Sequence, residues 1–287
     1  MAGSTTTTLN DLLPEIIQEA MFIANERSIM RGLVKNYTLA PGQGKNVNVP
    51  IYPQQTAVTV TEGNQVDNTA VSTDTAQLTV STAAIRTLLT DLARTTASSN
   101  VVADLGRLFG EAVARKMDQD ITALFTGFAA GEGDYSTAIT PAAIFAAVAK
   151  LRSTGLSMDG MVAVVHPAIA YDLKAALTTA GNTPFVADGM SMVANQAMSE
   201  GFVGRLAGIP VYETSNMAAV GGNAGDYAGA VFHRDAIGIG MVGDINIETQ
   251  RAASYLGDDI VCSAHYGVGK LVDAYGRYLA YDSSIVS

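Results

Sequence analysis

A long helical pattern between residues 96 and 128 constrains the fold of this chain more than any other stretch. Apolar residues recur there at three- and four-residue steps, which is the period of a helix with one buried stripe. They are Leu105, Leu108, Phe109, Ala112, Val113, Met117, Ile121, Leu124 and Phe125. Charged residues fill much of the remaining surface: Asp104, Arg107, Glu111, Arg115, Lys116, Asp118 and Asp120. A helix of roughly seven or eight turns predicts a strut around which the other elements pack.

A second helical stripe lies near the start of the chain, between Leu12 and Ala24, and includes Ile16, Ile17 and Met21. Its strongly apolar edge has to dock on another surface. That surface is either the chain's own domain or a neighbouring subunit, and the sequence leaves both open.

Between the two helices the period changes to two, first at 46–60 and again at 76–89. The polar segment that joins them carries Glu62, Asn64 and Asp67. Two alternating strands with a long polar connection predict an extended β-hairpin. Because a two-stranded hairpin is marginally stable alone and its connection is unusually long, we expect it to contact another subunit.

After the long helix the pattern is that of a compact α/β layer. The predicted elements are a helix from Pro141 to Gly155, a strand at 161–165, a helix from Pro167 to Leu177, strands at 209–213 and 229–232, and a Gly-rich loop at 216–227. Alternation resumes at 245–249 and 260–281, which predicts strands that return to pack near the long helix.

No motif for catalysis or cofactor binding stands out. His166, His233 and His265 are dispersed, and Cys262 is the single cysteine, so neither a metal site nor a disulfide within the chain is expected. The glycines at 238–243 match a dinucleotide fingerprint in form, but an alternating strand follows where that motif needs a helix.

The net charge of −10 argues against a protein that grips nucleic-acid phosphates, because such binding needs clustered Lys and Arg. The chain also has no apolar run of the length needed to span a membrane, and its first residues lack the pattern of a signal peptide.

The order of these parts resembles the major capsid proteins of tailed bacteriophages of the Hong Kong 97 type, whose fold encapsulin shell proteins share. Local likenesses are MVAVVHPAIAYDLKAAL at 161–177, GRLAGIPVYETSNM at 204–217 and AVFHRDAIGIG at 230–240. The resemblance covers nearly the whole chain. It implies an α+β fold with an N-terminal arm, an extended E-loop hairpin, a peripheral domain with a long spine helix, and an α/β axial domain.

Carried over part by part, the resemblance divides the chain into four regions. They are the arm at 1–35, the E-loop hairpin at 36–93, the peripheral domain at 94–135 with 245–287, and the axial domain at 136–244. It also implies which residues lie at subunit interfaces. These are Ile16, Ile17 and Met21 on the arm, Glu62, Asn64 and Asp67 on the hairpin, Asn216 and Asn223 near the five- and six-fold axes, and Arg251, Asp258 and Asp259 near the three-fold junctions.

The implied function is a major capsid protein whose pentamers and hexamers form an icosahedral shell around double-stranded DNA. The resemblance implies no catalytic residue, cofactor, metal or membrane, and no sequence-specific DNA binding. Its implied partners are a scaffold protein, a portal and a decoration protein. The implied location is the virion capsid, assembled in the cytoplasm of a host bacterium.

Two departures from the family pattern modify this expectation. Some members form a Lys–Asn crosslink between the E-loop and the three-fold loop, but no lysine lies between Val47 and Arg86 and no asparagine lies in 251–259. We therefore expect no such crosslink. Other members carry an N-terminal scaffolding domain, whereas this sequence starts close to the arm, which favours a separate scaffold protein.

Two other functions stay open at this point. An encapsulin-like compartment would hold a cargo-peptide tail in place of a genome. A soluble α/β enzyme with an unrecognised site would be a monomer without large assemblies.

Overall fold

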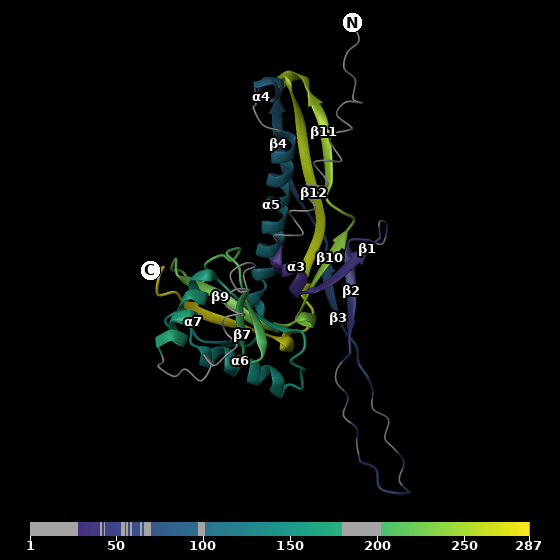
Figure 1. Ribbon diagram of the computed structural model, residues 1–287. Coiled ribbons are helices and arrows are strands. Elements are labelled where there is room, and N and C mark those ends of the chain that lie inside the picture. Colours follow the sequence, from purple (N-terminus) through teal and green to yellow (C-terminus); the bar gives the residue numbers. More distant parts are fainter. Residues whose placement is uncertain are drawn as a thin grey trace.

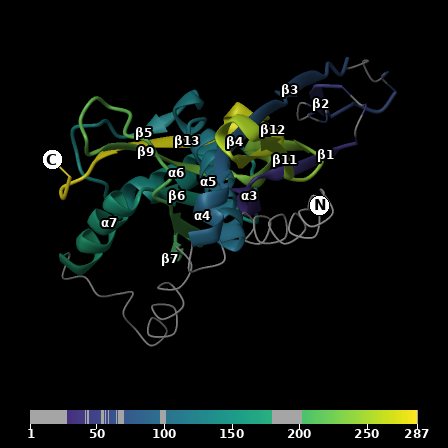
Figure 2. The ribbon, with the colours of Figure 1, turned by 90° about the horizontal axis from the view of Figure 1, so that it is seen from above.

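The computed structural model describes residues 28–40, 42, 44–52, 55, 57, 59–63, 65, 70–96, 101–179 and 202–286. In these residues, one long helix lies beside an elongated sheet, a compact α/β unit sits at one end of that helix, and a hairpin projects from the body (Figure 1). The predicted mixture of helices and strands is therefore confirmed. Figure 2 shows from above that the hairpin and the α/β unit lie on opposite sides of the helix.

The predicted strut is α5 (Val101–Thr122), which has 22 residues and follows the short helix α4 (Asp91–Thr96). It is shorter than the predicted span because the chain leaves the helix and forms the 3₁₀ turn η1 (Phe125–Gly127). This turn directs Phe125 into the core, where its ring centroid lies 5.6 Å from that of Phe232 in the α/β unit. The end of the strut is thus packed into the neighbouring sheet.

Two residues of α5 lie on the opposite side from the one predicted. Leu108, assigned to the buried stripe, has 52% of its surface exposed. Asp118, assigned to the charged face, is fully buried because the short helix α3 (Ile29–Leu33) covers this part of α5. The apolar period located the buried face correctly, but it could not show where a second segment covers the polar flank.

The elongated sheet has five strands. They are β1 (Lys35–Leu39), β10 (Ile237–Val242), β12 (Gly257–Lys270) and β11 (Asn246–Ala252) in that order, with β4 (Ser81–Thr90) also paired to β12. All pairs that involve β12 are antiparallel, whereas β1 and β10 are parallel. The prediction that late strands return to pack near the long helix holds for β12, which contacts α5.

The predicted hairpin is present at its base as β2 (Asn46–Ile51) and β3 (Asp74–Thr79), paired antiparallel from Asn46–Thr79 to Ile51–Asp74. The hairpin is shorter than expected, because the second alternating segment divides after Thr79. Its later part is β4, which joins the five-stranded sheet through ten register pairs with β12. The described residues between β2 and β3, such as 59–63, lie away from the body (Figure 1).

The α/β unit holds the second large sheet. Its order is β5 (Gly131–Glu132), β13 (Gly276–Asp282), β9 (Asp226–His233), β6 (Met161–Val165), β8 (Ile209–Glu213) and β7 (Phe202–Leu206). Helices α6 (Pro141–Ser153) and α7 (Pro167–Thr179) supply Ile144, Leu151 and Leu173 to a core against one face. The other face contributes Val164 and Phe232 to the core around α5. Because both faces are covered, all five residues of β6 are buried.

The predicted boundary at 244/245 does not follow the sheets. β10, expected in the axial domain, belongs to the elongated sheet, and β13, expected in the peripheral domain, belongs to the six-stranded sheet. The chain crosses between the sheets at the 3₁₀ turns η2 (Arg234–Ala236) and η4 (Asp273–Tyr275). Alternation of apolar residues identified these segments as strands, but it carries no information on which sheet they join.

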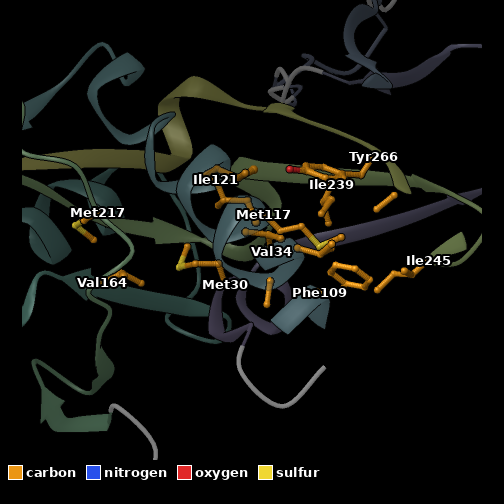
Figure 3. Packing of buried hydrophobic residues seen from close by; sticks show 14 of the residues in the cluster. Met30, Val34, Phe109, Met117, Ile121, Val164, Met217, Ile239, Ile245 and Tyr266 are labelled. Carbon is orange, nitrogen blue, oxygen red and sulfur yellow. The ribbon is translucent and has the colours of Figure 1, made fainter. Parts of the chain in front are cut away.

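A continuous apolar core unites α3, α5 and the two large sheets. Figure 3 shows Phe109, Met117 and Ile121 of α5 packed together with Met30 and Ile239 from other segments. Each of these five side chains is at most 2% exposed. Burial of a side chain of this size contributes about 1.5–3 kcal/mol, so this core positions both ends of the molecule relative to α5.

Candidate subunit-interface sites

The base of the hairpin rests on three glycines of β10 and β12, Gly240, Gly267 and Gly269, which we call the glycine seat. A Cβ atom on Gly267 would overlap the carbonyl oxygen of Thr79, and one on Gly269 would lie 2.7 Å from Leu78 Cδ2. None of the three glycines has a positive φ, so backbone conformation does not require glycine at these positions. At Gly267 the obstacle is the hairpin backbone, and at Gly240 and Gly269 it is the side chains of Val47 and Leu78, so the close approach of the hairpin explains these glycines.

Leu78 fixes the hairpin on this seat. It is fully buried, although it belongs to a sheet of only two strands. The backbone N–H of Val80 also donates to the Lys45 carbonyl at 2.9 Å, which closes the hairpin at its base. The inner end of the hairpin is therefore part of the subunit core, while its outer part extends beyond it.

Of the three hairpin residues assigned to an interface, Glu62 is exposed in a turn at the far end. Asn64 and Asp67 lie outside the described residues. The arm residues Ile16, Ile17 and Met21 also lie outside them.

The opposite end of the elongated sheet, formed by α4, the last residues of β4 and the β11–β12 connection, is here called the distal end (Figure 1). Arg251 of β11 binds Asp91 of α4 through two Nη–Oδ contacts of 2.7 and 2.6 Å. Its Nη1 also lies 3.4 Å from Asp258 Oδ1, and Arg94 contacts Asp258 Oδ2 at 2.5 Å. Arg251 and Asp258, both predicted interface residues, are thus brought together. Asp91 and Arg94 join them, although the sequence did not predict these two as interface residues.

A second ion pair at the distal end joins Arg86 of β4 to Asp259 of β12. The Arg86 Nε lies 2.7 and 2.8 Å from the two carboxylate oxygens. Hydrogen bonding to Arg86 lowers the pKa of Asp259, and Arg251 lowers the pKa of Asp91 in the same way. The available signal in the sequence was the presence of opposite charges in 86–94 and 251–259, but only pairing of β4 with β12 brings them together.

Three large apolar side chains are also exposed at the distal end. Leu92, Tyr255 and Leu256 are 73%, 64% and 69% exposed. Leu256 adopts a left-handed conformation with φ +47°, and its carbonyl accepts the N–H of Asp91 at 2.9 Å, so the turn is fixed despite its exposure. Exposed apolar patches rimmed by polar groups are typical of interaction sites, which makes this end a candidate interface.

The loop between β8 and β9 was expected to present Asn216 and Asn223 to neighbouring subunits. The structure directs Asn216 inward instead: its amide donates to Asp118 Oδ2 at 3.3 Å and its carbonyl accepts from Thr122 Oγ1 at 2.9 Å. Asn223 is exposed, and its backbone N–H donates to Asp226 Oδ2 at 3.0 Å. Asn223 therefore stays exposed, whereas the partly buried Asn216 is engaged within the subunit.

Asp118 joins this loop to the start of the described chain. Besides Asn216 it accepts a hydrogen bond from Ser28 Oγ at 2.9 Å, and backbone hydrogen bonds from Ile29 and Met30 lower its pKa in part. Burial is the larger effect and raises the pKa of this carboxyl. Asp118 therefore ties α5, α3 and the β8–β9 loop together, a role that its polar character in the sequence did not reveal.

Groups with chemical reactivity are engaged structurally. Cys262 is buried, which raises the pKa of its thiol to about 11. The His166 ring stacks on Tyr227 with centroids 3.6 Å apart, and burial lowers the pKa of His166. Across the described ranges, no group of three or more His, Cys, Asp or Glu side chains could hold a metal ion.

One hollow of about 400 Å³ lies between α5 and the β3–β4 segment. Its lining includes Lys116 and Asp120, which pair at 2.7 Å, and Tyr266, whose hydroxyl donates to Asp120 Oδ2 at 2.7 Å. Burial and this hydrogen bond raise the pKa of Tyr266. The hollow thus contains paired polar groups, without the activated nucleophile or poised base of a catalytic site.

None of the helices in the described part of the chain combines the length and apolar character that crossing a membrane requires.

Comparison with solved structures gives the same fold at low sequence identity. The chain matches the capsid of Cyanophage P-SCSP1u with a TM-score of 0.64 and 17% identity over 90% of this chain and 89% of that one. It matches Mycobacterium phage Che8 with a TM-score of 0.61 and 19% identity over 83% and 85% of the two chains. It matches the capsid of Ralstonia phage GP4 with a TM-score of 0.68 and 9% identity over 88% of this chain and 87% of that one. The phage capsid fold expected from the order of parts is confirmed.

Among curated proteins, none matches the chain by sequence. The sequence profile described as "Phage capsid protein" matches residues 73–280, which include β3, β4, the long helix α5 and both large sheets except β1 and the last two residues of β13. The chain belongs to the phage capsid protein family.

Proposed function

We propose that this chain is the major subunit of an icosahedral shell that encloses double-stranded phage DNA, built from pentamers and hexamers. The observation that carries the proposal is the hairpin, which is anchored in the core by Leu78 but projects beyond the body. A two-stranded sheet has little stability alone, so it gains by lying on a neighbouring subunit.

The distal end would supply the second contact. Its exposed Leu92, Tyr255 and Leu256 lie beside the Arg251–Asp91 pair, at the extremity opposite the hairpin. In the shell, this end would meet other copies near three-fold junctions, through Arg251, Asp258 and Asp259. Contacts at separate sites of one subunit raise the overall strength of assembly without any single strong contact.

The regions of the shell subunit follow from the sheets. The six-stranded unit, with the loop that carries Asn223, would be the axial domain near the five- and six-fold axes. The elongated sheet with α5 would be the peripheral domain, and the residues before Ser28, including Ile16, Ile17 and Met21, would form the arm. The net charge of −10 would keep the inner wall from holding DNA during packaging.

The role is structural and requires no catalytic residue or cofactor. The proposed partners are a separate scaffold protein, a portal and a decoration protein, and assembly would take place in the host bacterial cytoplasm before the subunit becomes part of the virion. These partners follow from the family alone, since the chain's own contacts are those of a single subunit.

The proposal predicts that the hairpin is dispensable for folding and required for assembly. Residues 60–70 are replaced by a short Gly-Ser linker, and a matched control keeps the length but replaces the same residues with Gly and Ser. We expect both variants to unfold within a few degrees of the wild type. The shortened variant should form no closed particles in negative-stain micrographs.

Loss of the cooperative unfolding transition in the shortened variant would contradict this assignment, because the hairpin would then belong to the core. Wild-type particles that enclose a cargo peptide and no genome would favour an encapsulin-like compartment. A wild-type monomer that forms no assembly would favour a soluble enzyme.

A further inference from the structure

Asp226, the first residue of β9, lies opposite Asp282, the last residue of β13. Asp226 and Asp282 are direct register partners in this antiparallel pair. The Asp226 carbonyl accepts from Val220 and the Asp282 N–H donates to Thr137, so these two residues do not exchange backbone hydrogen bonds. In such pairs the Cα atoms are about 4.5 Å apart and the side chains lie on the same face. Two carboxylates directly opposite one another repel.

Asp226 is buried without the partners that such a carboxylate needs. It is 0% exposed, and its Oδ1 has no hydrogen-bond partner in the described part of the chain. Its Oδ2 accepts the backbone N–H of Asn223. Asp118 is buried to the same extent, but it accepts hydrogen bonds from Ser28 and Asn216 as well as from two backbone groups. Asp226 is therefore the exceptional case, because a buried charge is normally paired or bound to a metal.

Within the described ranges, no cationic side chain is paired with either carboxylate. By contrast, Glu132 of β5 in the same sheet pairs with two cations, Lys150 at 2.7 Å and Arg277 at 2.9 Å. Burial, together with the charges of Tyr278 and Asp226, raises the pKa of Tyr135, as expected for a region of negative potential.

Two glycines allow close approach of the loop to the pair, and one of them brings a further oxygen near Asp282. A Cβ atom on Gly225 would overlap the Val286 carbonyl oxygen and lie 2.5 Å from Asp282 Oδ1, so these two oxygens are near neighbours. A Cβ atom on Gly221 would overlap Asp226 Oδ2. The loop backbone can therefore wrap the carboxylates only because residues 221 and 225 lack side chains.

We propose that Asp226 and Asp282 bind a divalent cation, Ca²⁺ in preference to Mg²⁺, which fastens the β8–β9 loop to the C-terminal strand. Two carboxylates, the Val286 carbonyl and water form the all-oxygen set that Ca²⁺ takes, with flexible geometry at 2.3–2.6 Å. Mg²⁺ demands a near-ideal octahedron, which a site assembled from a loop and two strands satisfies less well. No thiol or imidazole takes part, so the set does not suit Zn²⁺.

The test uses the unassembled full-length chain, freed of metal with a chelator that is then removed. Calorimetric titration with CaCl₂ should give one ion per chain, with weaker binding of MgCl₂. The thermal midpoint should rise by about 5 °C at a Ca²⁺ concentration of roughly a hundred times the dissociation constant. NaCl at matched ionic strength should not reproduce that rise.

Asp226→Asn and Asp282→Asn should each abolish Ca²⁺ binding and the Ca²⁺-dependent rise. The matched control is Asp244→Asn, an exposed aspartate in the turn between β10 and β11, which should retain both. Because Asp282 is only partly buried, its variant should fold even if the Asp226 variant does not.

Absence of Ca²⁺ binding by the wild type overturns the proposal. Binding that survives in Asp282→Asn overturns it too, since the ion would then lie elsewhere. If Asp226→Asn stabilises the chain equally with and without Ca²⁺, no ion relieves the repulsion between the two carboxylates and no cation site exists. These outcomes do not depend on shell assembly, so they test the cation site separately from the proposed function.

Discussion

The two ends of β12 are held by different kinds of contact. At the Lys270 end, the hairpin packs on the glycine seat, and its anchor Leu78 is fully buried. At the Gly257 end, Asp258 of β12 contacts Arg94 of α4 and Arg251 of β11. Arg251 also pairs with Asp91 of α4, and both of these side chains are nearly half exposed. One end is complete within the subunit, whereas the other leaves apolar and charged groups facing solvent.

This difference separates folding from assembly. Close apolar packing is insensitive to salt and pH, and each buried side chain of this size contributes about 1.5–3 kcal/mol. Exposed ion pairs contribute little to the stability of a monomer and are screened by salt. The seat therefore sets the direction of the hairpin, while the distal end presents groups that a neighbouring copy can complete.

The largest expected effect is that of Gly267→Val at the seat. The new side chain would overlap the Thr79 carbonyl, which is backbone and cannot move aside cheaply. Overpacking of this kind should lower the free energy of unfolding by about 3 kcal/mol, as measured by urea unfolding. The loss should be the same at low and high salt.

Gly32→Ala in α3 is the matched control, because a Cβ atom there meets nothing within 4 Å and alanine favours a helix. It should leave the free energy of unfolding unchanged or slightly higher. If Gly267→Val proved as harmless as the control, the hairpin would not rest on the seat in solution.

Local features of the fold could be predicted from the sequence, whereas pairings between distant segments could not. Strands β6 and β8 have the predicted bounds, since a short apolar run with turn residues on both sides identifies a buried strand. The assignment of β10 and β13 to opposite sheets was missed, because alternation does not specify the partner strand.

The candidate sites show the same limit. Arg251, Asp258 and Asp259 lie close together in sequence and were predicted together. Asp91 is 160 positions from Arg251, and only the fold brings these two residues into contact. The sequence shows that residues 267 and 269 are glycines, but it does not show why. The reason is the close approach of β3, which is far away in the chain.

An intermediate effect is expected for Asp258→Asn at the distal end. The Asp258 side chain is 8% exposed and lies between Arg94 and Arg251, so the substitution removes the charge that both arginines face. The free energy of unfolding should fall by about 1–2 kcal/mol in low salt. The loss should shrink in 1 M NaCl, unlike that of Gly267→Val.

Asp244→Asn controls for the removal of one negative charge, because Asp244 is exposed and lies outside the distal end. It should change the free energy of unfolding by less than about 0.5 kcal/mol. An Asp258→Asn loss that is independent of salt would mean that packing, not charge, holds the distal end.

The smallest and most local effect concerns pH. The pKa values of Asp91 and Asp259 are lowered by hydrogen bonds from Arg251 and Arg86, so their stabilising effect is present above the ordinary value of about 3.9. It is lost as the pH falls through the lowered values. Amide-exchange protection factors for β4 at the distal end should therefore decrease as the pH is lowered below about 3.9, while those for β3 at the seat stay constant. Arg86→Ala should remove part of this dependence, and a parallel loss of protection at both ends would show that the two ends are not held differently.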